Sequence, residues 1–367
     1  MVRQEIRDVN NPKTDKNITG IDIGYSNIKV VSESKIAKIP SYIKKIDNKY
    51  KFMSDLKDSD IYYKDESGVW AVGLAAYRLK VFDTSDTDED ILVSRNRTFS
   101  YEYKVQMNVA LGIAIGANPK KEVVIQTGLP CSYIKQDAQG LREELAGLHE
   151  FELRVGNNDW QRFSFEISPD NIKIMEQPFG SFFSISFDKD GNFVDNSNLN
   201  VLIVDGGFKT LDIAQINESV SGKSITFDNL GMLHVYQLAS DMIYKDTGAD
   251  VSVFSFDDAL AKGVYKHRNR RTKESISIDV KRYYDIALKM TAESIFEKLF
   301  NSYDGFNGVD TVILTGGTCD ACKDLLIPEF KKADVNVKMS NSNDPTMELG
   351  YSNARGYYLY RRSVEAN

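Results

Sequence analysis

The strongest structural signal in the chain is the run Val201-Leu202-Ile203-Val204-Asp205-Gly206-Gly207-Phe208-Lys209-Thr210-Leu211-Asp212-Ile213-Ala214. Its apolar beginning predicts a buried strand that ends at a carboxylate, Asp205. Gly206 and Gly207 predict a tight turn, and the alternation around Leu211 and Ile213 predicts a second, antiparallel strand. The run therefore predicts a hairpin with an acid at its mouth.

An acid beside a glycine turn suits a magnesium-phosphate group. Glycines let backbone N–H groups approach phosphate oxygens, and the carboxylate holds the metal ion or its waters. The same design occurs earlier, where Ile21–Val30 superposes on Val204–Ile213 without a gap. A single Asp-Gly turn usually forms only a hairpin, but a matched pair predicts two similar half-molecules that face each other across a nucleotide.

Composition places the chain among soluble globular proteins. It has 367 residues, 42% hydrophobic and 27% charged, enough for two cores. The net charge of −7 argues against direct, sequence-independent DNA binding, which needs a basic face. Residues 1–17 are too polar for a signal peptide, and the longest apolar patch, Val109–Ala117, is too short to span a bilayer.

Cysteine usage fits a reducing cytoplasm. The pair Cys319 and Cys322 has the spacing of a redox or zinc motif. No second cysteine pair accompanies it, and the three histidines are scattered, so a metal or redox centre is not expected.

The remaining pattern predicts alternating strands and helices. A hairpin with its turn at 65–68 and return strand at 69–73 marks an inserted subdomain. Strands are predicted at 122–126, 151–155, 162–167, 172–176 and 311–314, and helices at 101–117, 136–148, 179–187, 233–247, 256–265, 278–300, from about 320, and 345–360. Ser255 and Asp258 have the spacing of a capping box for the helix at 256–265.

Three polar stretches need separate interpretation. Gly222-Lys223-Ser224 resembles the end of a P-loop, but Asn217 stands where that motif needs glycine, so a surface hairpin turn is favoured. The acidic run Asp83–Asp90 is predicted to be a solvated loop. The basic run Lys266–Lys273 is also best read as a solvated loop, while contact with an acidic partner, a neighbouring subunit or nucleic acid remains open.

The order of these features resembles the ATPase superfamily that contains actin, Hsp70 and the sugar kinases, over essentially the whole chain. Ile21–Lys29 resembles its first phosphate motif, Val204–Asp212 its second, and Val312–Thr318 its adenosine motif. Further details are similar to the bacterial actin-like plasmid-segregation ATPases, the ParM group. These details are the turn Thr127-Gly128-Leu129-Pro130, the strand Val69–Gly73 followed by Ala75-Ala76, and the ending Asn353–Tyr357.

The resemblance implies an α/β fold of two actin-like domains, duplicated ribonuclease-H-like halves with a nucleotide cleft between them. Domain I would span residues 1–190, with an inserted subdomain at about 40–95 and a closing C-terminal helix at 345–363. Domain II would span residues 200–344, with an inserted helical subdomain at about 233–280.

The implied activity is hydrolysis of ATP, with GTP left open. The family polymerises with Mg-ATP, and hydrolysis destabilises the filament. In the ParM group the filament separates plasmid copies in the cytoplasm through a DNA-binding adaptor. A small-molecule kinase of the same superfamily and a non-polymerising nucleotide switch are the alternatives.

The resemblance implies a role for individual residues of this chain. Asp22 and Asp205 match the carboxylates that hold Mg²⁺, largely through waters. The nucleotide-binding positions are Asp22, Gly24, Tyr25, Ser26, Asn27, Lys29, Gly206, Gly207, Phe208, Thr210, Asp212, Gly316, Gly317 and Thr318. In these relatives the attacking water is oriented from the position just before the proline-containing helix. Here that position is Gln177, with Glu176 beside it, and Asp205 completes the catalytic candidates.

Overall fold

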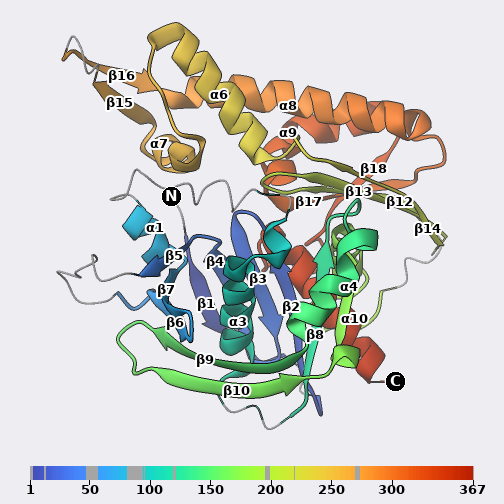
Figure 1. Cartoon of the computed structure of the whole chain (residues 1–367). Helices are drawn as coiled ribbons and strands as arrows, with labels where there is room; N and C mark the ends of the chain where they lie inside the picture. The colour runs from blue at the N-terminus through green and yellow to red at the C-terminus, as the bar shows by residue number, and fades with distance from the viewer. Residues whose placement is uncertain are drawn as a thin grey trace. The chain divides into compact units, whose positions relative to one another are not determined.

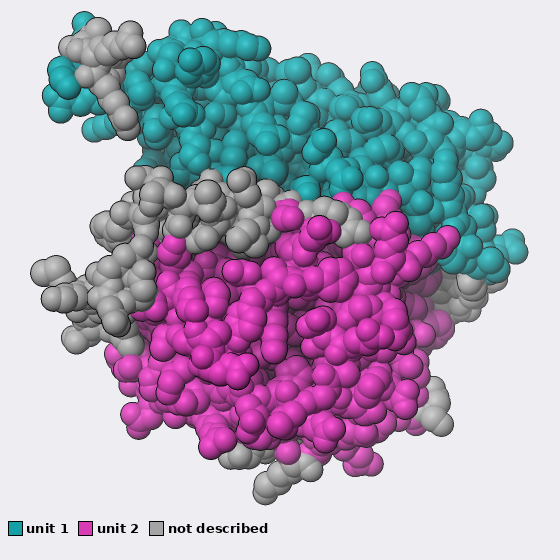
Figure 2. Space-filling model, viewed as in Figure 1, with its two compact units in different colours: residues 1–2, 195–340 teal, residues 3–194, 341–367 magenta. Residues whose placement is uncertain are grey.

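The computed structural model describes residues 3–11, 14–46, 57–80, 94, 96–117, 119, 121–194, 199–218, 220–268 and 273–366. The chain forms two compact units (Figure 1, Figure 2). Unit 1 comprises residues 1–2 and 195–340, and unit 2 comprises residues 3–194 and 341–367. The acidic run 83–90 lies outside the described residues, as does the part of the basic run at 269–272.

Unit 2 is built around a six-stranded sheet of order β1-β4-β3-β2-β8-β11. Its strands are β1 (Glu5–Asp8), β4 (Lys35–Pro40), β3 (Asn27–Ser32), β2 (Asn17–Ile23), β8 (Val123–Leu129) and β11 (Ile172–Glu176). The first four pair antiparallel, and β2, β8 and β11 pair parallel. The predicted first hairpin is therefore confirmed as β2–β3.

Helices cover both faces of this sheet. They are α3 (Tyr101–Ile115), α4 (Ile134–Leu145), α5 (Gln177–Ile185) and α10 (Ser352–Glu365). Ile21 and Ile28 pack in one core cluster with α3, whereas Ile18 and Val31 pack in another with α10. This division follows from the strand period of two, which sends alternate side chains to opposite faces.

A second sheet of unit 2 has the order β10-β9-β6-β7-β5. Its strands are β5 (Ile43–Ile46), β6 (Ile61–Asp65), β7 (Gly68–Val72), β9 (Gly147–Val155) and β10 (Gln161–Ile167), and helix α1 (Leu74–Lys80) packs against it. The predicted turn before Gly68 is confirmed. Strands β9 and β10, which come later in the chain, thus complete the sheet that the inserted residues begin. The local sequence pattern did not indicate this pairing.

Unit 1 contains a five-stranded sheet of order β14-β13-β12-β17-β18. Its strands are β12 (Asn200–Gly206), β13 (Leu211–Asn217), β14 (Val220–Phe227), β17 (Thr311–Thr315) and β18 (Asn336–Met339). The three strands β14, β13 and β12 pair antiparallel, and β12, β17 and β18 pair parallel. This pattern repeats β4-β3-β2-β8-β11 of unit 2 strand by strand, so the predicted duplication is confirmed.

The helices of unit 1 are α6 (Met232–Thr247), α7 (Phe256–Lys262), α8 (Val280–Ser302) and α9 (Gly316–Lys332). Helices α8 and α9 share a core cluster with the sheet. A separate cluster joins α6, α7 and the first part of α8. A short hairpin of β15 (Val264–Arg268) and β16 (Ser275–Asp279) connects α7 to α8.

Five local predictions were wrong. Helix α7 ends at Lys262, because Gly263 adopts the left-handed conformation at φ 71°, and the residues predicted as its last turn form β15. Ser255 does not cap α7, since its hydroxyl donates to the Ser252 carbonyl 3.1 Å away. Gly222–Ser224 lies inside β14 rather than at a turn.

The other two concern helix starts. Helix α9 begins at Gly316, not near residue 320, so the diglycine is its first turn. Helix α10 begins only at Ser352, after the 3-10 turn Leu349–Tyr351. Among the described helices, none is long and apolar enough to cross a membrane.

Candidate functional site

In unit 2 three of the predicted residues meet at one carboxylate. Asp22, next to the end of β2, is only 3% exposed. The Lys29 ammonium lies 3.0 Å from Asp22 Oδ2, and the Gln177 amide Nε2 donates to Asp22 Oδ1 at 2.8 Å. Lys29 comes from the returning strand β3 and Gln177 from the first residue of α5. The fold thus joins the acid of the first turn to the residue predicted to orient water.

The β2–β3 turn is tightly constrained. The Gly24 N–H donates to the Asn27 carbonyl at 2.9 Å, and the Ser41 hydroxyl donates to the Gly24 carbonyl at 2.8 Å. The Ser41 N–H also donates to the Ser26 carbonyl at 2.9 Å. A Cβ at Gly24 would lie 2.9 Å from the Asn27 carbonyl oxygen, a backbone atom, so glycine is required by close approach.

Arg97 is a further part of this turn, and the sequence pattern did not reveal it. Its buried guanidinium donates to the carbonyls of Ile23 and Gly24 and lies 3.9 Å from the centroid of the Tyr25 ring. Burial raises the pKa of nearby Tyr103 to about 12, so that ring stays neutral beside the arginine. Arg97 lies 73 positions after Gly24 and has no diagnostic spacing to it.

The β12–β13 turn of unit 1 repeats this geometry. The Gly207 N–H donates to the Thr210 carbonyl at 2.9 Å, the same bond at the matched positions. The Gly207 carbonyl accepts from the Thr318 hydroxyl of α9 at 2.6 Å and from the Met232 N–H of α6 at 3.3 Å. Two helix starts therefore hold the second turn, and the buried Thr318 hydroxyl contacts it directly.

Asp205 adjoins the first turn of α9. It is 6% exposed and lies beside Thr315 in the parallel pair β12–β17. Gly316 has φ 81°, and a Cβ there would lie 2.6 Å from Asp205 Oδ1, whereas a Cβ at Gly317 would meet nothing within 4 Å. No side chain caps this helix, whose N-terminus carries partial positive charge.

The remaining predicted positions contact protein groups. Asp212, 2% exposed, accepts from the Thr210 hydroxyl at 2.8 Å and from the Thr226 hydroxyl at 2.6 Å, so its carboxylate holds the second turn. Phe208 packs in the core cluster of α6. Glu176 is the half-buried residue that precedes α5, and its side chain makes no capping bond.

The two cysteines of the redox-like motif are core residues of α9. Cys319 Sγ lies 3.5 Å from the Val204 carbonyl, and both thiols are buried. Burial raises the pKa of Cys322 to about 12 and that of Cys319 further, so both thiols stay protonated.

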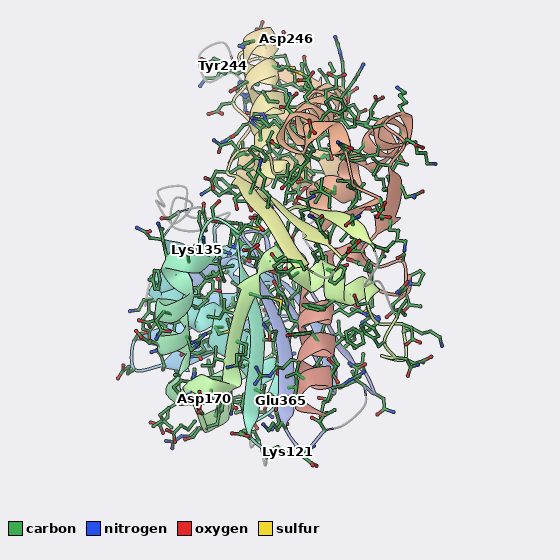
Figure 3. The ribbon with its side chains drawn as sticks, turned by 90° about the vertical axis from the view of Figure 1, so that its right-hand side faces the viewer. Lys121, Lys135, Asp170, Tyr244, Asp246 and Glu365 are labelled. Carbon is green, nitrogen blue, oxygen red and sulfur yellow. The ribbon has the colours of Figure 1, made fainter. Side chains whose placement is uncertain are left out.

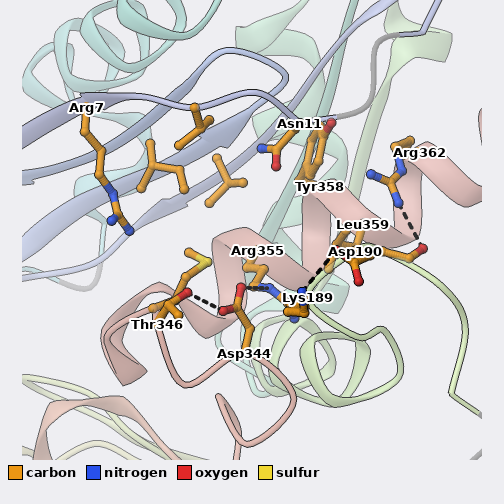
Figure 4. A pocket seen from close by; sticks show the side chains of 15 residues that line it. Arg7, Asn11, Lys189, Asp190, Asp344, Thr346, Arg355, Tyr358, Leu359 and Arg362 are labelled. Carbon is orange, nitrogen blue, oxygen red and sulfur yellow. Dashed lines mark hydrogen bonds and ion pairs between the residues drawn. The ribbon is translucent and has the colours of Figure 1, made fainter.

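Unit 2 also has a partly open pocket of about 190 Å³, and none of the predicted site residues lines it. Figure 4 shows Arg355 of α10 beside Asp344 in its wall. The Arg355 guanidinium lies 3.4 Å from Asp344 Oδ2 and donates to the carbonyls of Ser184 and Asp188 at 2.6 and 2.7 Å. These bonds fasten α10 to the end of α5, a structural role.

Comparison with known proteins identifies the architecture. Residues 20–180 match the family model of actin like proteins, N terminal domain. A solved non-polymerisable quadruple mutant of pCBH ParM is 22% identical, with a TM-score of 0.73 over 95% of this chain and 99% of that one. The fold is actin-like.

Two further solved structures resemble this actin-like chain over nearly its full length. A 15-stranded ParM filament from Clostridium botulinum is 22% identical, covers 95% of this chain and 100% of its own, and has a TM-score of 0.70. Ta0583, an archaeal actin homologue in complex with ADP, is 17% identical, covers 96% and 100%, and has a TM-score of 0.66. No curated protein sequence matches significantly.

Proposed function

We propose that this actin-like chain is an ATPase that polymerises with Mg-ATP and disassembles on hydrolysis. The observation that carries the proposal is the matched pair of glycine turns, each closed by the same backbone hydrogen bond and each preceded by a buried aspartate. Such turns suit the phosphates of a nucleotide. The ADP complex of the similar Ta0583 supports nucleotide binding by this fold.

The donor set of the two turns fits a hydrated magnesium ion and phosphate oxygens. Asp22 and Asp205 supply the hard carboxylate oxygens that Mg²⁺ prefers, usually through its waters. Bound Mg²⁺ would neutralise charge on the transferring phosphoryl group. The backbone N–H groups of the turns and the N-terminus of α9 provide partial positive charge that complements the phosphate oxygens. Lys29, already paired to Asp22, adds a cation beside the first turn.

Gln177 is the residue that we propose to orient the attacking water. Its Nε2 is committed to Asp22 Oδ1, which directs the amide oxygen Oε1 away from that carboxylate. An amide oxygen accepts a hydrogen bond from water without taking its proton. Water so aligned attacks the γ-phosphorus, and the bond from phosphorus to the ADP oxygen breaks.

Assembly and cargo belong to the same proposal. The similar ParM from Clostridium botulinum was solved as a filament, which supports self-association of this chain. We propose that the filament segregates plasmid DNA through an adaptor protein, because the net charge of −7 disfavours direct contact with DNA. Domain I is assigned to residues 1–190 with the C-terminal helix, and domain II to residues 200–344.

Light scattering and pelleting of the purified chain test the proposal. Polymer should form with Mg-ATP, should be absent without nucleotide, and should decay as phosphate is released. A chain that hydrolyses ATP but stays monomeric at micromolar concentration would contradict filament formation and favour a small-molecule kinase. A chain that binds ATP with neither hydrolysis nor assembly would favour a nucleotide switch.

A further inference from the structure

The basic run of the sequence lies on a separate two-stranded hairpin. Among the described strands, β15 and β16 pair with each other alone, and they project beside α7 in unit 1 (Figure 1). Residues Lys266–Arg268, expected in a loop, belong to β15, which corrects that prediction. An isolated two-stranded hairpin is only marginally stable in water. The stability of this one therefore depends on the packing of one of its faces against the rest of unit 1.

One face of the hairpin is anchored and the other is exposed. Tyr265 and Ile278 are directly opposed, and both pack in the core cluster of α6 and α7. Alternation along β15 then turns Lys266 and Arg268 outward, where both are exposed. The residues opposite them on β16 are Ser277 and Ser275, whose short side chains leave the two cations prominent.

Within the described part of the chain, no ion pair involves Lys266, Arg268 or Lys273. The Arg268 Nε donates to the Lys273 carbonyl at 3.4 Å. By contrast, Lys281 of the adjacent helix α8 is paired with Asp285 at 2.6 Å.

Charge on the chain is strongly divided. Residues 266–273 contain five lysines and arginines and no acid, a formal charge of +5. The whole chain carries −7, so everything outside this run carries −7 − 5 = −12. The acidic remainder of a second copy is therefore complementary in charge to the hairpin.

We propose that the outward face of the β15–β16 hairpin is an assembly surface that binds the acidic surface of a second copy of this chain. This inference rests on the proposed function. A basic hairpin on one copy and an acidic surface elsewhere on the next form a heterologous contact. Such contacts repeat from head to tail and generate open filaments. Electrostatic attraction of this kind acts mainly on the rate of encounter and on register.

Reversal of the hairpin charges tests the proposal. The triple variant Lys266→Glu, Arg268→Glu, Lys273→Glu should raise the critical concentration for Mg-ATP assembly by about tenfold or more, since it replaces attraction with repulsion. Rising salt should raise the critical concentration of the parent and bring the two proteins closer together. The charge-retaining variant Lys266→Arg, Arg268→Lys, Lys273→Arg should assemble as the parent does.

A matched control separates the hairpin from net charge. Lys245→Glu, Lys331→Glu, Lys338→Glu changes three exposed lysines of the same unit by the same total charge. It should leave assembly at the parental level. Equal loss of assembly in both reversed proteins would overturn the proposal, because the effect would then be one of net charge.

Other outcomes are equally informative. Charged side chains also protect open strand edges, and glutamate does this as well as lysine. If the hairpin reversal leaves assembly unchanged in a parent that polymerises, the cations only protect the edge, and the inference is wrong while the proposed function stands. If the parent binds a labelled DNA duplex and the reversed hairpin abolishes that binding but not assembly, the surface is a nucleic-acid site.

A parent that does not polymerise would contradict the proposed function. Sedimentation at low ionic strength then tests the hairpin by itself. Self-association that the hairpin reversal abolishes would support the inference, and a strictly monomeric parent would overturn it.

Discussion

At the scale of single residues, the contact between Asp22 and Gln177 links the metal-binding and hydrolytic parts of the proposed site. The amide of Gln177 is held in one orientation, because its nitrogen donates to a carboxylate that is also paired with Lys29. A side chain that is oriented before the substrate arrives needs no reorganisation during the reaction. The two residues thus have distinct roles although they touch.

Substitution of Gln177 should separate binding from hydrolysis. Gln177→Ala should lower phosphate release about 10²- to 10³-fold, by analogy with loss of one preorganised polar group, and leave ATP affinity nearly unchanged. Filaments of this variant should persist. Glu176→Ala, measured in parallel for affinity, phosphate release and filament lifetime, should have the smaller effect on release. Parental release rates in both variants would show that the water is held by another residue.

The two glycines at the start of α9 offer a sharper comparison. Gly316→Ala places a Cβ at φ 81° and 2.3 Å from the Gly206 carbonyl oxygen, so the free energy of unfolding should fall by about 1–3 kcal/mol. Gly317→Ala meets nothing within 4 Å and should not destabilise the chain. If the adenosine moiety approaches Gly317, its alanine variant should weaken ATP binding while it unfolds normally. Denaturant unfolding and nucleotide titration distinguish these effects.

The sequence predicted those site residues that are close together along the chain. The acid, the glycines and the return strand of each hairpin fall within about ten residues, so local pattern sufficed for them. Arg97, which holds the first turn, comes from a distant segment and gives no local signal. The resemblance assigns Asp212 to nucleotide binding. Its carboxylate also accepts hydrogen bonds from the hydroxyls of Thr210 and Thr226, so it has a structural role within the sheet as well.

At the scale of elements, α10 and α5 pack with their backbones in direct contact. A Cβ at Gly356 would lie 1.7 Å from the Gly180 carbonyl oxygen, and one at Gly180 would lie 2.8 Å from Asn353 Cα. The Tyr357 hydroxyl donates to the Gln177 carbonyl at 3.3 Å. The C-terminal helix thereby supports the helix that carries Gln177.

Enlargement of Gly356 should loosen this support. Gly356→Ala forces the two helices apart and should lower the free energy of unfolding by about 1–3 kcal/mol, the usual cost of overpacking. It should also reduce phosphate release, since Gln177 shifts with α5. Gly350→Ala is the control, because the nearest atom to its Cβ lies 4.0 Å away. An unfolding midpoint unchanged by Gly356→Ala would mean that the helices tolerate separation.

A buried polar chain connects α3 to the second sheet of unit 2. The Tyr63 hydroxyl donates to Asp65 at 2.7 Å and accepts from the Asn108 amide at 3.1 Å. The Asn108 carbonyl oxygen then faces His149 Nδ1 at 2.8 Å. Burial lowers the pKa of His149, so the folded chain binds its proton less readily than the unfolded chain does.

This shift predicts that stability depends on pH. Because the unfolded state binds the extra proton, the contribution of neutral His149 is fully present above the unfolded pKa, near 6.5, and is lost as pH falls from there towards the lowered folded pKa. The free energy of unfolding should therefore decrease between about pH 7 and pH 5. In His149→Gln this part of the slope should vanish. An identical slope in both proteins would assign the pH dependence to other groups.

Element boundaries were predicted less well than element types. The strand alternation and the long amphipathic helices were confirmed, but α7 ended early at Gly263 and α10 began late at Ser352. Ion pairs hold the last turn of α10, where Glu365 lies 2.6 Å from both Lys16 and Arg361. Figure 3 labels Glu365 and Lys121 at one end of unit 2. The contact between Lys16 and Glu365 is long-range and leaves no periodic signal.

At the scale of the whole molecule, duplication is the property that the sequence predicted best. One ten-residue match between Ile21–Val30 and Val204–Ile213 anticipated two sheets of the same strand order. The additions that distinguish the units include strand β1 and the second sheet of unit 2, and the β15–β16 hairpin of unit 1. They have no counterpart in the other half of the sequence, so no internal comparison could predict their pairing.

Because the two turns are duplicates, Mg-ATP should affect both units. Hydrogen exchange with Mg-ATP should show slower exchange of backbone amides at the β2–β3 turn of unit 2 and at the β12–β13 turn of unit 1. Asp205→Ala removes a carboxylate from unit 1 alone, yet it should weaken Mg-ATP binding and reduce protection at both turns. Removal of Mg²⁺ with a chelator should have the same effect on the parent. Protection confined to one turn would mean that a single unit binds the nucleotide, and the second hairpin would then be a duplicate retained for the fold.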